Sequence, residues 1–324
     1  MNIRVGIVGI SGFGGGEALR LLANHPSFEL VYAAGDSSAG KSLADLYPGI
    51  ASRLANLVVE KWDPDNLPEL DLLFASMPTG ASAKALAGVR DDVKILDIGG
   101  DHRYAGGWVY GLADVWPSEI VGQSRVANPG CFPAATQIAL APLLKDGLID
   151  PENIIIDAKT GISGAGRGGG TGLSYATHNE NLVPYGLLNH VHMPEMTHTI
   201  ERLSGGSARG LVFTPHLVPM TRGILVTIYC RGSATTRQCL DAARACYAES
   251  HFVRVTDLPP HTKWVSGSNL AIVNYAADPS RNLVMAMGVV DNLGKGAAGQ
   301  AIQNANLMCG LPEAEGLDGM SLWP

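Results

Sequence analysis

The sequence lacks the features that mark several large classes of protein. Only 16% of its 324 residues are charged and the net charge is −7, so a nucleic acid or an anionic membrane surface is not expected as the main partner. No apolar run is long enough to span a bilayer. Heptads, solenoid periods and low-complexity tracts are absent too, which argues against coiled-coil, repeat and disordered proteins.

Cysteine is also sparse. The five cysteines form no C-x-x-C pair, and an odd count without metal-ligand spacing is typical of a reducing cytoplasm. The opening residues, Met1 to Val5, lead directly into an expected strand, so we expect no secretory signal. Hydrophobic residues make up 46% of the chain and there are 40 glycines, a composition that favours a compact, loop-rich enzyme of one or two domains.

A glycine-rich turn is the first informative motif. Residues 4–8 predict a strand and residues 17–22 predict a helix, with Gly9, Gly12 and Gly15 between them. This spacing is a variant of G-x-G-x-x-G, in which the missing side chains let the backbone approach a dinucleotide diphosphate. Because the motif lies at the first strand-to-helix turn, we favour a nucleotide site over an ordinary flexible loop.

Further strands and helices alternate after this motif, which predicts a parallel, doubly wound α/β sheet. Strands are expected at residues 29–34, 71–75 and 94–98, and a helix at residues 81–89. A cofactor would lie at the carboxyl ends of such strands, where the turn containing Pro78 follows the third strand.

The residues after the second strand bear on the choice of cofactor. Asp36 could bind the ribose hydroxyls of NAD, whereas Ser37, Ser38 and Lys41 could accept the extra phosphate of NADP. The pattern itself leaves both cofactors open.

The second half is richer in β-prone runs, which predicts an α+β domain around a large mixed or antiparallel sheet. Strands are expected at residues 154–158, 211–218, 224–229, 270–275 and 283–290, and helices at residues 236–250 and 295–308.

Cys131 lies in the segment N-P-G-C-F-P. Pro129 and Gly130 favour a turn, and Pro133 fits the first turn of a helix that continues through apolar residues to Leu144. The thiol is therefore expected at a helix N-terminus, where unpaired N–H groups stabilise a thiolate. A small buried hydrophobic residue is the alternative, and the spacing alone leaves both readings open.

Two histidines and a carboxylate lie within six residues, at His190, His192 and Glu195. We expect the two imidazoles to share one face of an extended segment. A third metal ligand at a recognisable spacing is not evident, so no metal is predicted. We expect instead that one histidine lies beside a cysteine nucleophile and is oriented by Glu195. The alternative is that both histidines are solvated and have no catalytic role.

Residues 163–170 form a second glycine-rich stretch, which begins at Ser163 and Gly164 and carries one cation, Arg167. Its backbone N–H groups could bind a phosphate or an oxyanion. A mobile surface loop is the alternative.

Taken in order, these segments resemble the N-acetyl-gamma-glutamyl-phosphate reductases, a family of arginine biosynthesis related to aspartate-semialdehyde dehydrogenase. The resemblance runs almost from end to end. It is carried by residues 9–17, 101–103, 128–133, 160–167, 190–195, 215–223 and 291–300.

The resemblance implies an NADPH-dependent reduction of an acyl phosphate to a semialdehyde and inorganic phosphate. Cys131 would be the nucleophile that forms a thioester on the enzyme. His192 would be the general acid and base, oriented by Glu195, with His190 in support. The family pattern also implies a homodimer or homotetramer in the cytoplasm.

The resemblance further assigns binding residues and domains. It implies NADP at Gly9, Ser11, Gly12, Phe13, Gly14, Ser37, Ser38, Pro78, Ser163, Gly164 and Asn292. It implies substrate binding at Arg103, Asn128, Arg167 and Arg222. Residues 1–129 plus 296–324 would form a Rossmann-like NADP-binding domain, because the last helix packs back against it in the family. Residues 130–295 would form the catalytic and oligomerisation domain, of α+β type with a large mixed sheet.

Two other functions are compatible with the sequence. The first is reduction of N-acetyl-aminoadipyl phosphate, or of its carrier-protein-linked form, in lysine biosynthesis, which would use the same catalytic residues. The second is a non-catalytic NADP-binding sensor, against which Cys131, His192 and Glu195 argue.

Overall fold

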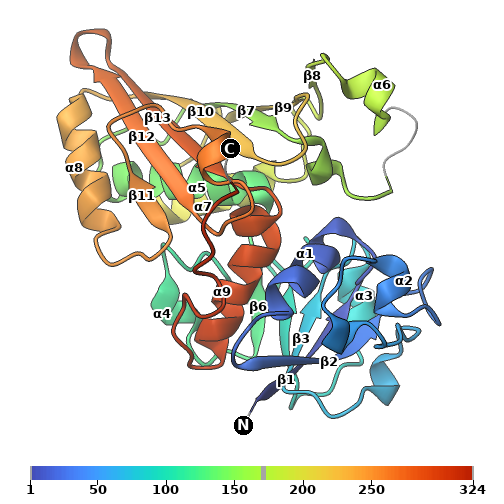
Figure 1. The fold of residues 1–324 in the computed structure, drawn as a ribbon. Coiled ribbons are helices and arrows are strands. Elements are labelled where there is room, and N and C mark those ends of the chain that lie inside the picture. The colour runs from blue at the N-terminus through green and yellow to red at the C-terminus, as the bar shows by residue number, and fades with distance from the viewer. Residues whose placement is uncertain (1, 169–172, 323–324) are drawn as a thin grey trace. The chain divides into compact units, whose positions relative to one another are not determined.

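The computed structural model of the chain describes residues 2–168 and 173–322, and it divides into two compact units (Figure 1). Unit 1 comprises Met1–Pro129 and Ala297–Gly319, and unit 2 comprises Gly130–Gly296 and Met320–Pro324. Gly169 and Gly170, the last two residues of the second glycine-rich stretch, lie outside the described residues.

Unit 1 is built on a parallel sheet. Its six strands have the order β2-β1-β3-β4-β6-β5, and every neighbouring pair is parallel. The strands are β1 (Ile3–Val8), β2 (Phe28–Ala34), β3 (Leu72–Ala75), β4 (Lys94–Asp97), β5 (Val109–Tyr110) and β6 (Arg125–Ala127). The helices are α1 (Phe13–Leu22), α2 (Leu43–Leu46), α3 (Ser82–Leu86), α4 (Pro117–Ile120) and α9 (Gly299–Met308).

The strand order places three loops at one edge of this sheet. Strand β1 lies between β2 and β3, so the chain leaves β1 beside the carboxyl ends of both neighbours. Parallel sheets bind ligands at such points, because the connections that follow two neighbouring strands run to opposite faces of the sheet and leave a crevice at the carboxyl ends. The three turns from which a nucleotide site is predicted therefore share this edge.

Unit 2 is built on a mixed sheet. Its seven strands have the order β11-β12-β13-β10-β7-β9-β8, in which β11 with β12 and β7 with β9 are parallel and the other pairs antiparallel. The strands are β7 (Ile155–Thr160), β8 (Val183–Pro184), β9 (Val212–Leu217), β10 (Ile224–Arg231), β11 (Val253–Val255), β12 (Ala271–Asp278) and β13 (Leu283–Val290). The predicted fold class, a parallel α/β unit plus an α+β unit with a large mixed sheet, is confirmed.

Helix α5 (Cys131–Lys145) is the centre of unit 2, which also contains α6 (Tyr175–His178), α7 (Met193–Ser204) and α8 (Thr236–Cys246). It is buried from Phe132 to Leu144 and contacts α7, α8 and strands β10, β12 and β13 (Figure 1). Pro142 cannot donate the helical hydrogen bond to Ile138, and the Tyr247 hydroxyl donates to that carbonyl instead, at 2.6 Å. The helix is therefore fixed on all sides.

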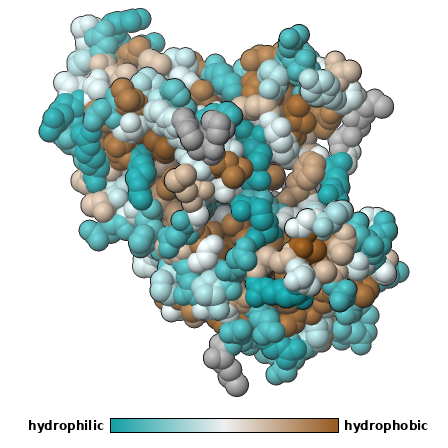
Figure 2. Space-filling view, in the orientation of Figure 1, coloured by the Kyte–Doolittle hydropathy of each residue, from teal (hydrophilic) through white to brown (hydrophobic). Residues whose placement is uncertain are grey.

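The surface is mixed in character. Hydrophilic and hydrophobic side chains are interspersed on the face shown in Figure 2. Within residues 2–168 and 173–322, no helix combines the length and the apolar character needed to cross a membrane. The segment that precedes α7 exposes several apolar side chains, with Leu182, Leu187, Leu188 and Val191 each more than half exposed.

A buried histidine holds the C-terminal segment of unit 1. His25 Nδ1 accepts the backbone N–H groups of Ser27 and Phe28 at 3.3 and 3.0 Å, and Nε2 lies 3.1 Å from Asn306 Oδ1. Because Nδ1 is an acceptor, the ring is neutral with its proton on Nε2. Burial lowers the pKa of His25 below its ordinary value of 6.5, against the raising effects of Asn306 and Glu315.

This arrangement predicts an acid-sensitive stability. The unfolded chain takes up a proton on His25 as the pH falls below 6.5 whereas the folded chain resists it, so stability is lost in that direction. The loss attributable to one proton is at most about 1.4 kcal/mol per pH unit. Urea unfolding between about pH 7.5 and pH 5 should show a shallower fall of stability for His25→Asn than for the wild type, because the contribution of His25 is lost whereas that of the buried His190 remains. His251→Asn, an exposed control, should keep the slope; parallel curves for wild type and His25→Asn would contradict the prediction.

Candidate active site

Cys131 is the first residue of α5, as predicted. Gly130 is the N-cap residue, in an extended conformation with φ −67° and ψ 157°, and it has no side chain to cap the helix. The Cys131 thiol is not in a disulfide and is partly exposed. Backbone N–H groups of the first turn are thus available to stabilise negative charge beside the sulfur.

The segment with the two histidines is the start of a helix, and the expectation of an extended segment is wrong. His192 is the N-cap residue of α7, with φ −88° and ψ −7°, and Pro194 and Glu195 lie in the first turn. Proline at the start of a helix has its φ already set and needs no hydrogen-bond partner, which explains the helix. The Glu195 side chain is 1% exposed, and its Oε1 accepts the Gly130 N–H at 2.8 Å.

The His192 ring lies directly on the turn that carries Cys131. A Cβ atom at Gly130 would be 2.5 Å from His192 Nε2, so only glycine allows this approach. Glu195 and His192 therefore both contact Gly130, the residue before Cys131. The Glu195 carboxylate accepts the Gly130 N–H, and the His192 imidazole lies against the Gly130 Cα.

His190 lies behind His192. Its Nδ1 accepts the His192 backbone N–H at 3.1 Å, and the two ring centroids are 4.9 Å apart. The His190 ring also packs edge-on against Phe132, Tyr185 and Phe213. Burial lowers the pKa of His190, which favours the neutral ring.

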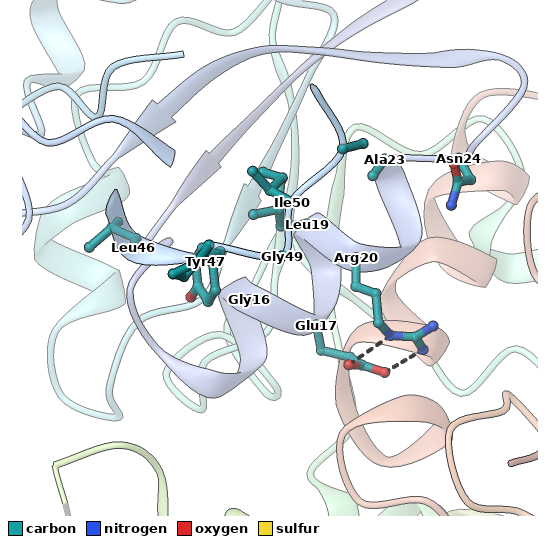
Figure 3. A pocket seen from close by; sticks show the side chains of 12 residues that line it. Gly16, Glu17, Leu19, Arg20, Ala23, Asn24, Leu46, Tyr47, Gly49 and Ile50 are labelled. Carbon is teal, nitrogen blue, oxygen red and sulfur yellow. Dashed lines mark hydrogen bonds and ion pairs between the residues drawn. The ribbon is translucent and has the colours of Figure 1, made fainter. Parts of the chain in front are cut away.

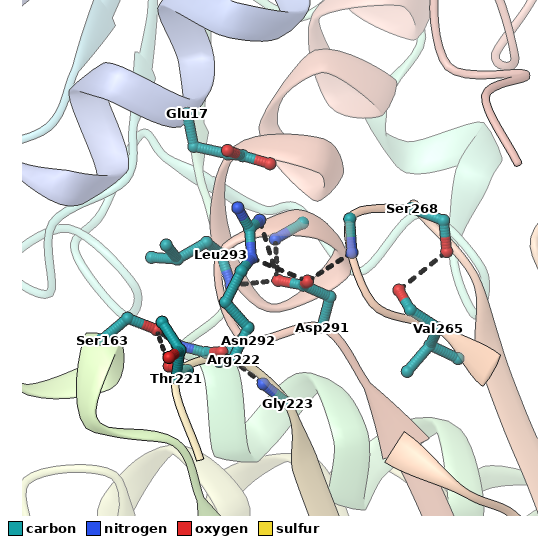
Figure 4. Close-up of polar contacts among 12 residues, drawn as sticks. Glu17, Ser163, Thr221, Arg222, Gly223, Val265, Ser268, Asp291, Asn292 and Leu293 are labelled. Carbon is teal, nitrogen blue, oxygen red and sulfur yellow. Dashed lines mark hydrogen bonds and ion pairs between the residues drawn. The ribbon is translucent and has the colours of Figure 1, made fainter. Parts of the chain in front are cut away.

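A buried polar chain joins three loops of unit 2. The Ser163 hydroxyl donates to the Thr221 carbonyl at 2.6 Å, and Asn292 Nδ2 donates to Ser163 Oγ at 2.8 Å. The Gly223 N–H donates to Asn292 Oδ1 at 2.7 Å (Figure 4). Two of the residues predicted to bind the cofactor, Ser163 and Asn292, are thus brought together, and Gly164 is exposed beside Ser163.

The two candidate anion-binding arginines of unit 2 differ. Arg222 forms a two-point ion pair with Asp291, with Nε–Oδ2 at 2.9 Å and Nη2–Oδ1 at 3.0 Å (Figure 4). Its side chain is 21% exposed, whereas the Asp291 carboxylate is fully buried. Arg167 is exposed in the loop that follows Ser163.

In unit 1, the glycine motif brings three backbone segments together. Gly9 has φ +81°, and a Cβ there would be 2.0 Å from the Ser76 carbonyl oxygen at the end of β3. A Cβ at Gly15 would be 2.4 Å from the Gly9 carbonyl oxygen, and one at Gly14 would be 2.7 Å from Ser76 Oγ. Gly12 is the N-cap residue of α1. This is the cramped turn that a diphosphate-binding loop requires.

Tyr47 holds this turn from the other side, a contact that the sequence did not reveal. Its hydroxyl donates to the Ile10 carbonyl at 2.7 Å, and its ring lies on Gly16, where a Cβ would be 2.7 Å from the hydroxyl oxygen. Tyr47 also lines a pocket of about 620 Å³ along α1, together with Leu19 and Arg20 (Figure 3).

The remaining cofactor candidates of unit 1 lie on the loops at the same sheet edge. Ser11 and Phe13 belong to the glycine turn, and Pro78 is exposed after β3. Ser37 is exposed after β2, whereas Ser38 is 2% exposed. Ser38 Oγ is buried and has no hydrogen-bond partner within residues 2–168 and 173–322.

The substrate candidates of unit 1 contact one another. Arg103 Nε donates to the Asn128 carbonyl at 3.0 Å. The Asn128 side chain is fully buried, where Nδ2 donates to the Ala297 carbonyl at 3.1 Å and Oδ1 accepts from Asn304 at 3.0 Å. These contacts give the Asn128 side chain a structural role inside unit 1.

A buried Asp–His pair in unit 1 was not foreseen. Asp97 Oδ2 lies 2.6 Å from His102 Nδ1 and accepts from Ser82 at 3.0 Å, and the His102 ring stacks on Trp108 at 3.9 Å. The sequence indicated that Asp97 needs a hydrogen-bond partner, because it ends a buried strand. It did not indicate which residue, since the fold alone brings His102 to Asp97. Among the described residues, no group of three or more His, Cys, Asp or Glu side chains is placed to hold a metal ion.

Two family models cover most of the chain. Residues 4–123 match the NAD-binding domain of semialdehyde dehydrogenases, and residues 131–292 match the dimerisation domain of the same enzymes. These two matches make the chain an oxidoreductase of the semialdehyde dehydrogenase class, with a domain of the NAD-binding type and a domain of the dimerisation type.

Relatives with known names narrow the assignment. The chain is 74% identical to the N-acetyl-gamma-glutamyl-phosphate reductase of Bradyrhizobium sp. strain BTAi1, over 100% of both chains. It is 43% identical to the enzyme of that name from Symbiobacterium thermophilum, over 98% of both. The chain belongs to the N-acetyl-gamma-glutamyl-phosphate reductase family, and the family predicted from the sequence is confirmed.

Solved structures agree in fold. Aspartate semialdehyde dehydrogenase II from Vibrio cholerae, complexed with ASA, superposes with a TM-score of 0.76 at 19% identity, over 95% of this chain and 98% of that one. Aspartate semialdehyde dehydrogenase from Candida albicans, solved with NADP, has a TM-score of 0.75 at 18% identity, over 95% of this chain and 99% of that one.

Proposed function

We propose that this chain reduces N-acetyl-gamma-glutamyl phosphate, with NADPH and a proton, to N-acetyl-glutamate semialdehyde, NADP⁺ and inorganic phosphate. The observation that carries the proposal is the thiol of Cys131 at the start of α5, with the His192 ring against the preceding residue. The full-length relatives at 74% identity carry the name of this activity and so supply the substrate.

Cys131 acts as the nucleophile. His192 takes the proton of the thiol, and the thiolate attacks the acyl carbon of the substrate. The carbon–oxygen bond to phosphate breaks, the departing phosphate receives the proton from His192, and a thioester remains on Cys131. N–H groups of the first turn of α5 stabilise the oxyanion in this step.

NADPH is the proposed cofactor, which when bound supplies a hydride to the acyl carbon. The glycine turn at Gly9, Gly12 and Gly14, with Ser11 and Phe13, would hold the diphosphate, and Pro78 would border it. Ser37 and Ser38 would receive the phosphate that distinguishes NADP from NAD, and the orphaned Ser38 hydroxyl supports this choice. The family resemblance adds Ser163, Gly164 and Asn292 to the residues proposed to hold the cofactor.

The last step restores the enzyme. When the oxyanion of the thiohemiacetal collapses, the carbon–sulfur bond breaks, the semialdehyde leaves and the Cys131 thiolate is regenerated. His192 then passes a proton from solvent to the Cys131 thiolate. This is the one proton that the overall reaction consumes. Glu195 fixes the turn through the Gly130 N–H, and His190 supports the His192 backbone.

The arginines are proposed as anion-binding groups. The substrate carries a carboxylate and a phosphoryl group, and guanidinium groups bind both at two points. Arg103 and Arg167 are the proposed direct contacts, with Arg222 as a third whose orientation is set by Asp291. Asn128 would act by positioning Arg103, whose Nε donates to its carbonyl.

We further propose that residues 1–129 plus 296–324 bind the nucleotide and that residues 130–295 carry the chemistry and the contacts of a homodimer or homotetramer. The exposed apolar side chains before α7 support a surface of this kind on unit 2. None of the five cysteines is in a disulfide, which supports a reducing compartment, the cytoplasm.

The reverse reaction tests the substrate. Purified enzyme is given NADP⁺, phosphate and N-acetylated semialdehydes that differ by one methylene, and nucleotide reduction is followed by absorbance. We expect the glutamate semialdehyde to be preferred over the aminoadipate homologue by roughly 10-fold or more in kcat/KM, the usual effect of one methylene in a pocket. Preference for the longer compound would overturn the assignment, and nucleotide binding without turnover on either would overturn the enzymatic function.

A further inference from the structure

Asp291 is a buried carboxylate with an unusual number of donors. It follows β13 and is 0% exposed. Besides the two bonds from Arg222, it accepts the backbone N–H groups of Gly267 at 2.6 Å and of Leu293 and Gly294 at 2.8 Å each (Figure 4). A buried charge is tolerated when it is paired and hydrogen-bonded in this way, and the same bonds fix the start of the following segment.

That segment leads from the carboxylate to the thiol. The Gly296 N–H donates to the Asp291 carbonyl at 2.8 Å, which closes the segment on itself. A Cβ at Gly296 would be 2.9 Å from Cys131 Cβ and 3.3 Å from Cys131 Cα, so the Gly296 backbone lies against the cysteine. Lys295, also 0% exposed, places its Nζ 5.1 Å from the ring centre of Phe252.

The segment 291–296 is therefore a wall of the turn that carries Cys131, and it is held at both ends. The carboxylate of its first residue, Asp291, accepts five hydrogen bonds, and its last residue, Gly296, contacts Cys131. If the carboxylate loses one acceptor oxygen, the backbone N–H groups of Gly267, Leu293 and Gly294 and the Arg222 guanidinium compete for the other, and the wall moves away from Cys131.

We propose that Asp291 is a positioning residue for Cys131, which holds segment 291–296 against the turn and so keeps the thiol in its reactive geometry. The proposal rests on the role of Cys131 as nucleophile given above. It assigns the buried Arg222–Asp291 pair a part in catalysis that is exerted through the segment and needs no contact with substrate.

The test is D291N, which keeps the shape of the side chain and removes one acceptor oxygen and the charge. The pH profile of Cys131 alkylation by iodoacetamide is measured without substrate, by mass spectrometry of the peptide that contains Cys131. We expect its midpoint to rise by about one pH unit as the thiolate loses its fixed surroundings. We expect kcat to fall roughly 10²-fold, the usual effect of a misplaced reacting group, with the affinity for NADPH unchanged.

Two further variants keep the test decisive. D241N breaks an exposed ion pair between Arg237 and Asp241 on α8 and should be wild type in both measurements. G296A leaves the Asp291 carboxylate unchanged but puts a methyl group 2.9 Å from Cys131 Cβ and 3.1 Å from the Asp291 carbonyl oxygen. It should shift the same midpoint and lower kcat even if D291N does not fold.

Either D291N or G296A, if it binds NADPH and shows a wild-type midpoint and kcat, overturns the proposal. Because alkylation needs no substrate, its outcome is separate from the proposed reaction. A wild-type enzyme without turnover would overturn the proposed function while the alkylation profiles still decide the role of Asp291.

Discussion

Replacing Cys131 with serine should abolish reduction while leaving NADPH binding nearly intact. A serine hydroxyl stays protonated where a thiol at a helix N-terminus ionises, so no acyl intermediate forms. The rate should fall by roughly 10⁴-fold or more, as for other enzymes that lose their nucleophile. Steady-state turnover on the acyl phosphate and titration of NADPH by fluorescence measure the two quantities.

Cys246→Ser is the matched control, because Cys246 is also a partly exposed free thiol of unit 2. It should keep wild-type turnover. Loss of NADPH binding in Cys131→Ser, or substantial turnover by that variant, would count against the assignment of Cys131.

Replacing His192 with asparagine should lower turnover by roughly 10²–10⁴-fold, the range for a positioned acid–base group. Asparagine keeps a polar side chain at the start of α7 but cannot carry the proton between the Cys131 thiol and the leaving phosphate. The NADPH affinity should not change, because His192 is not among the residues proposed to hold the cofactor. Turnover across the pH range, with saturating NADPH, is the measurement.

His198 provides the control on the same helix, since its side chain is exposed. His198→Asn should behave as wild type. A wild-type rate for His192→Asn would transfer the acid–base role to His190, whose ring stacks edge-on against that of His192.

Local signals were enough to predict the two turns that matter most. The strand, glycine turn and helix at the N-terminus follow from the spacing of Gly9, Gly12 and Gly15, because those positions leave no room for a Cβ or cap the helix. The start of α5 follows from Pro129 and Pro133, whose fixed φ angles restrict the chain before and inside the first turn.

The start of α7 shows why other features could not be predicted. The alternation of His190 and His192 suggested an extended segment, but Pro194 lies in the first turn of a helix. An alternating pattern of two residues is too short to predict a strand when a proline that favours a helix start follows it. The long-range contacts of Asp291 could not be predicted from the residues around it in the sequence. Its partners Arg222 and Gly267 are distant in sequence, and only the pairing of β10 with β13 brings Arg222 within reach.

The points where the chain enters and leaves unit 2 have a consequence for how such an enzyme can be built. Unit 2 begins at Gly130 and its main segment ends at Gly296, and Gly296 lies against Cys131. A segment whose two ends touch has the layout of an inserted domain. Such a domain can be inserted into another domain without moving apart the two residues between which it is inserted. Cys131, the proposed nucleophile, thus lies at the start of the inserted part, so an exchange of that part between relatives would carry Cys131, His192 and segment 291–296 together.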